Sequence, residues 1–102
     1  MDFSQLPDDV VVALTIWGEA RGEPIEGQIG VACVIRNRLR RAVDTAPRWR
    51  DICLAPKQFS CFNVNDPNRP RAEAMAERVM MDDPDLPIEW RQALWIASGV
   101  MA

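Results

Sequence analysis

Two glutamates stand close together in the stretch Trp17–Pro24, between two apolar segments of the chain. Glu19 follows an apolar run, and Glu23 lies between Gly22 and Pro24. Carboxylic acids placed at a glycine-rich corner can donate and accept protons during catalysis. The same stretch would also suit a plain turn between two helices with solvated charges. The two glutamates alone therefore leave both interpretations open.

The segment before this corner predicts a helix from about Pro7 to Ala20. Proline suits a first helical position, and apolar residues recur at helical spacing from Val10 to Leu14. Glu19 then lies in the last turn, where the negative end of the helix dipole disfavours the carboxylate anion. Partial burial would act in the same direction. We therefore expect Glu19 to act as an acid.

A second helix is expected from about Ile25 to Arg41, with Gln28, Val31, Ala32, Ile35 and Leu39 on one face. Gly27 and Gly30 would each weaken this helix by about 1 kcal/mol relative to alanine. We expect them to allow the close approach of another backbone, which would make this helix central. The end of this helix is strongly basic and carries Arg36, Arg38, Arg40 and Arg41. This basic end is either a solvated helix terminus or a surface that binds an anionic polymer.

The middle of the chain, residues 42–68, contains no sustained helical pattern. Residues 48–54 suit a short helical turn or strand, and residues 57–63 read as a short extended piece with alternating apolar residues. Two further helices are expected over about 70–81 and from Pro87 to the end of the chain. The predicted fold class is α+β and mainly helical, with about four helices and a short irregular or β region.

Composition excludes several classes of function. The net charge of −3 argues against nucleic-acid binding, and no apolar run is long enough to span a membrane. The chain has no histidine, which excludes Ser-His-Asp and Cys-His mechanisms within it. The three cysteines match no zinc pattern. Cys33 is expected in the core, whereas Cys53 and Cys61 could pair in an oxidising compartment.

Three blocks of sequence resemble the cell wall hydrolases of the spore-cortex-lytic type, the SleB/CwlJ family. The first is Thr15–Pro24, and the second comprises Glu26–Gln28 and Val31–Arg38. The third, Gln58–Asn63 with Asn65–Asn68, is similar to the form seen in phage and prophage members. The resemblance runs in continuous order over about residues 10–100.

This resemblance implies a lysozyme-like domain that cleaves the glycan strands of peptidoglycan. Glu19 matches the catalytic acid of the family. The implied reaction is lytic transglycosylation between N-acetylmuramic acid and N-acetylglucosamine, which needs no metal or other cofactor. A hydrolytic muramidase or glucosaminidase on the same scaffold is an alternative, as is a non-catalytic glycan-binding module.

The remaining candidate site residues follow from the same comparison. Glu23 is either a second acid or a scaffold residue at the corner. Gln58, Phe59 and Ser60 are expected to contact substrate, because an amide, a stacking ring and a hydroxyl suit a sugar. Phe59 would fit equally well in the core. Arg21 either orients an acid or is a salt-bridge partner at the corner, and we expect the second role.

The two ends of the sequence carry expectations of their own. The last helical pattern has no terminating Gly or Pro, which predicts a single domain over residues 1–102 that is cut short at its C-terminus. The first residues lack the basic region and apolar core of a signal peptide. This suits a phage-type lysin that is made in the cytoplasm and acts at the cell wall after release.

Overall fold

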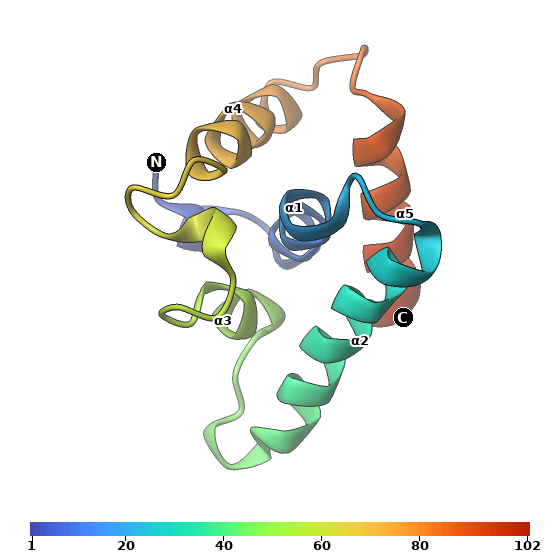
Figure 1. Ribbon diagram of the computed structural model, residues 1–102. Coiled ribbons are helices and arrows are strands. Elements are labelled where there is room, and N and C mark those ends of the chain that lie inside the picture. The colour runs from blue at the N-terminus through green and yellow to red at the C-terminus, as the bar shows by residue number, and fades with distance from the viewer.

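Helix α1 (Asp8–Ala20) is the centre of the molecule. In the computed structural model, which describes residues 1–102, every residue from Val10 to Gly18 is buried. Figure 1 shows α1 nearly end-on, with the other helices placed around it. A helix that is apolar on all sides requires partners on all sides. The acid-bearing corner is therefore attached to the most enclosed element of the fold.

Four more helices surround α1, joined by turns and short 3-10 segments. The helices are α2 (Ile25–Arg41), α3 (Trp49–Leu54), α4 (Arg69–Met80) and α5 (Ile88–Met101). The 3-10 segments are η1 (Phe3–Gln5), η2 (Val43–Thr45) and η3 (Ser60–Phe62). The four predicted helices are confirmed to within one or two residues at their ends. Proline immediately precedes or opens each of them, as its fixed φ angle favours, at Pro7, Pro24, Pro70 and Pro87.

The middle region was predicted to be irregular or β, and the β alternative is wrong because the structure contains no strand. Residues 49–54 form α3, whose first turn is closed by a 2.8 Å hydrogen bond from the Arg48 N–H to Asp51 Oδ2. The segment expected to be extended turns at Lys57, where φ is 63°, and then coils into η3. A lone extended segment has no neighbouring strand to bond, whereas η3 buries Cys61 against α1.

The face predicted for α2 is buried in part, and α4 and α5 also bury one face each. On α2 the buried residues are Gln28, Ala32 and Ile35. On α4 they are Ala72, Met75 and Ala76, and on α5 they are Trp90, Ala93, Ile96 and Ala97. None of the helices combines the length and hydropathy that crossing a lipid bilayer would require.

The expectation that α2 is the central helix is wrong. Gly27 and Gly30 are both exposed, and a Cβ built on Gly30 would meet nothing within 4 Å. The close approach occurs on α1 instead, at Gly18, where a Cβ would lie 2.9 Å from both Cβ and Sγ of Cys61. The glycine that packing requires is therefore the one beside Glu19.

The three cysteines are free thiols. Cys53 and Cys61 are buried in the core. Cys33, which was expected in the core, is only half-buried and lines a hollow of about 530 Å³ between α2 and α5. Trp95 borders the same hollow and is 69% exposed.

Candidate functional site

Glu19 lies half-buried in the last turn of α1, and both of its carboxylate oxygens accept hydrogen bonds from one residue. The Ser60 N–H donates to Oε1 at 3.1 Å, and the Ser60 hydroxyl donates to Oε2 at 3.3 Å. These two residues are 41 positions apart in the sequence. The structure thus brings together two of the predicted site residues and fixes the carboxylate in one orientation.

Close packing between Gly18 and Cys61 positions this contact. Because Gly18 has no side chain, η3 lies directly on α1, and Ser60 is thereby held beside Glu19. Burial, reinforced by the negative charges of Glu19 and Asp66, raises the pKa of the Cys61 thiol to about 12. Cys61 is therefore a neutral packing group rather than a nucleophile.

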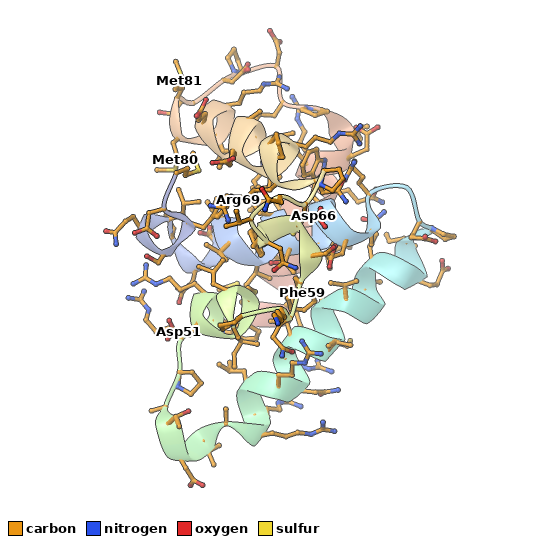
Figure 2. The ribbon with its side chains drawn as sticks, turned by 60° about the vertical axis from the view of Figure 1, so that its left-hand side comes forward. Asp51, Phe59, Asp66, Arg69, Met80 and Met81 are labelled. Atoms are coloured by element: carbon orange, nitrogen blue, oxygen red, sulfur yellow. The ribbon has the colours of Figure 1, made fainter.

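The far end of η3 is anchored to the N-terminal segment and to α4. The Arg69 guanidinium donates to the Phe62 carbonyl and lies 5.2 Å from the centre of the Phe3 ring. The rings of Phe3 and Phe62 pack edge-to-face with their centres 5.0 Å apart. Figure 2 shows Arg69 and Asp66 on the chain that leads from η3 into α4. With both ends fixed, η3 presents Ser60 to Glu19 on a rigid support.

Phe59 lies between η3 and α2, as Figure 2 shows. Its side chain is 8% exposed, and the Arg38 guanidinium lies 5.3 Å from the centre of its ring. The ring is thus a core residue with a cation over it. Arg38 joins the site through this contact, which sequence reasoning missed because nothing local links position 38 to position 59.

Gln58 and Glu23 both have exposed side chains that form no hydrogen bond. Gln58 is held through its backbone, whose N–H donates to the Ala55 carbonyl at 3.1 Å. Glu23 also acts through its backbone, because its carbonyl accepts a 3.1 Å hydrogen bond from Gln28 Nε2. That bond closes the corner between α1 and α2 and leaves the Glu23 carboxylate free.

Arg21 does not form the salt bridge that the sequence suggested. Its Nη1 donates to the carbonyls of Trp17 at 3.4 Å and Gly18 at 3.3 Å. Its guanidinium also lies 4.8 Å from the centre of the Trp17 ring. Arg21 therefore caps the end of α1, where carbonyls lack helical partners.

Comparison with known families adds an independent finding. Residues 22–95 match the model of the cell wall hydrolase family. The chain belongs to the cell wall hydrolase family. This match begins after Glu19, so the assignment of the family does not rest on the candidate acid.

Curated relatives of this cell wall hydrolase agree with the family. It is 36% identical over 83 residues to a spore cortex-lytic enzyme of Oceanobacillus iheyensis, over 76% of this chain and 29% of the relative. It is 59% identical over 29 residues to a spore cortex-lytic enzyme of Bacillus subtilis, over 28% of this chain and 10% of the relative. The chain thus spans less than a third of the length of these relatives. No solved structure matches it.

Proposed function

We propose that residues 1–102 form a domain that cleaves peptidoglycan glycan strands as a lytic transglycosylase, with Glu19 as the acid and base. The observation that carries the proposal is the half-buried Glu19 carboxylate, which Ser60 holds through both oxygens in a member of the cell wall hydrolase family. The site of action would be the cell wall. Release of a phage-type enzyme stays a prediction from the resemblance.

One carboxyl group is sufficient for this reaction. Protonated Glu19 donates its proton to the glycosidic oxygen, the bond from that oxygen to C1 of the muramoyl residue breaks, and N-acetylglucosamine leaves. The acetamido group of the substrate stabilises the positive charge that develops at C1. The Glu19 carboxylate then accepts the proton of the C6 hydroxyl as its oxygen bonds to C1. The product is a 1,6-anhydromuramoyl end, and no water is consumed.

Ser60 suits both protonation states of Glu19. A serine hydroxyl can donate to a carboxylate and accept from a carboxylic acid, whereas a backbone N–H can only donate. The N–H therefore fixes the oxygen Oε1, and the hydroxyl adapts to the proton at Oε2. We assign the exposed amide of Gln58 to substrate contact. The Phe59 ring is buried and covered by Arg38, so we assign it the role of holding the neighbouring Gln58 in place.

The decisive experiment compares Glu19→Gln with Glu23→Gln. Both changes remove one negative charge from the same corner, but only Glu19 is held by Ser60. We expect the Glu19 variant to lose at least about a hundredfold in murein cleavage, as loss of general acid–base catalysis predicts. The Glu23 variant should keep most of the activity.

Mass spectrometry of the digest identifies the reaction. Anhydromuramoyl ends support transglycosylation, and reducing ends indicate a hydrolytic muramidase or glucosaminidase instead. Equal activity of the parent protein and the Glu19 variant would refute the assignment of the acid. Binding to murein by both, without cleavage by either, would establish a glycan-binding module.

A further inference from the structure

A basic hollow lies at the same end of α1 as Glu19, on the side that faces α4. It has a volume of about 350 Å³. Three guanidinium groups and no carboxylate belong to the residues that line it: Trp17, Arg21, Arg71, Ala74, Met75, Arg78 and Pro87. The whole chain carries a net charge of −3, so this cluster does not reflect a general basic excess.

Two of the three cations have no ionic partner. Arg78 pairs with Asp83 through a 2.8 Å contact from Nε to Oδ2 and also donates to the Asp85 carbonyl. Arg21 and Arg71 form no ion pair. The hollow therefore holds two positive charges without an ion-pair partner, above the largely buried side chains of Trp17 and Met75.

Arg21 is already oriented for binding. Its Nη1 is held by two backbone carbonyls, and its Cζ lies 4.8 Å from the centre of the Trp17 ring. A guanidinium fixed in this way loses little freedom when a ligand arrives. Carboxylates match its planar fork of donors.

The location of the hollow relates it to the candidate acid. Trp17 and Arg21 are one turn apart and share one side of α1, whereas Glu19 between them faces another side. A ligand that reaches both places must branch around the end of the helix. A glycan strand that carries peptide stems has this form, with carboxylates on the stems.

We propose that this hollow binds the carboxylates of peptidoglycan stem peptides while the glycan strand lies at Glu19. The proposal rests on the proposed function for its choice of polymer. Arg71 supplies the free charge, and Arg21 supplies the oriented fork.

Binding measurements on the Glu19→Gln protein test the proposal without cleavage of the ligand. The probes are a muramoyl disaccharide that carries a tetrapeptide stem and the same disaccharide without a peptide. Nuclear magnetic resonance follows the indole N–H of Trp17 during each titration. We expect only the probe with the stem to shift this signal.

Substitutions of single arginines then identify the positive charge that binds the stem peptide. Arg71→Gln should weaken binding of the stem probe by about two- to fivefold, as loss of one exposed ion pair predicts, and Arg71→Lys should recover part of it. Neither change should alter binding of the plain disaccharide. Arg91→Gln is the matched control, because it removes one positive charge from the exposed surface of α5.

Three results would overturn the proposal. The first is unchanged binding of the stem probe by Arg71→Gln, and the second is an equal loss with Arg91→Gln. The third is a shift of the Trp17 signal by a polyphosphate but not by the stem probe. Arg71-dependent binding in a protein that never cleaves murein would uphold this proposal while refuting transglycosylation.

Discussion

At the scale of single residues, the central feature is a carboxylate with a dedicated partner. Glu19 accepts two hydrogen bonds from Ser60, whereas the Glu23 carboxylate accepts none. The two glutamates were similar in sequence, and the structure separates them by their contacts. A fixed orientation matters because proton transfer requires the acid within hydrogen-bonding distance of the oxygen that it protonates.

Ser60→Ala tests the hydroxyl apart from the backbone. The N–H contact to Oε1 remains in this variant, whereas the contact to Oε2 is lost. We expect a three- to tenfold lower kcat for murein cleavage, since one hydrogen bond contributes on the order of 1 kcal/mol. Ser60→Thr keeps the hydroxyl and should keep most of the rate. A Ser60→Ala enzyme with parental kcat and unchanged thermal stability would show that the hydroxyl has no part in the reaction.

At the scale of elements, the contact between α1 and η3 positions the site. Gly18 permits this contact, and Cys61 fills the space that a side chain would occupy. The position of Ser60 therefore depends on how closely α1 and η3 approach at the adjacent residues Gly18 and Cys61. Packing and chemistry are coupled at this point of the fold.

Gly18→Ala and Gly30→Ala should have opposite effects on stability. A Cβ at Gly18 would lie 2.9 Å from Cys61, so we expect about 1–3 kcal/mol of destabilisation and a loss of activity as η3 shifts. A Cβ at Gly30 meets nothing, and alanine favours the helix, so we expect about 0.5–1 kcal/mol of stabilisation. Urea unfolding measures both. Equal destabilisation by the two changes would contradict the assigned contacts.

The features of the fold that depend on local sequence pattern could be predicted from the sequence. Prolines and apolar spacing located four helices, because both act within a few residues of the feature that they determine. The role of Gly18 could not be predicted in this way. A glycine in the sequence shows that a side chain is absent, but only the fold shows whether a neighbour uses the space.

At the scale of the whole molecule, α1 is enclosed by every other helix, and its end carries both proposed binding regions. The contacts that form them join positions distant in sequence, such as Glu19 with Ser60 and Arg38 with Phe59. The resemblance suggested the first pair as members of one site, but no pattern suggested the second. Long-range pairings of this kind depend on how the helices pack, which periodicity does not specify.

Alkaline pH should destabilise the protein through its two buried thiols. Burial raises the pKa of Cys53 and of Cys61 from 9.0 to about 12. Between these values the unfolded chain loses the thiol protons and the folded chain keeps them. Stability is therefore fully present below pH 9 and falls as pH rises towards 12, by at most about 1.4 kcal/mol per thiol for each pH unit.

Few other side chains ordinarily titrate in this window, because the chain has no tyrosine and only one lysine. Urea unfolding under reducing conditions from pH 8 to pH 11 measures the slope. Cys53→Ala should lower the overall stability but flatten its dependence on pH, since one titrating thiol is gone. Cys33→Ala is the control, because Cys33 is only half-buried and its removal should leave the slope intact. A parental slope in the Cys53 variant would mean that the buried thiols do not govern alkaline unfolding.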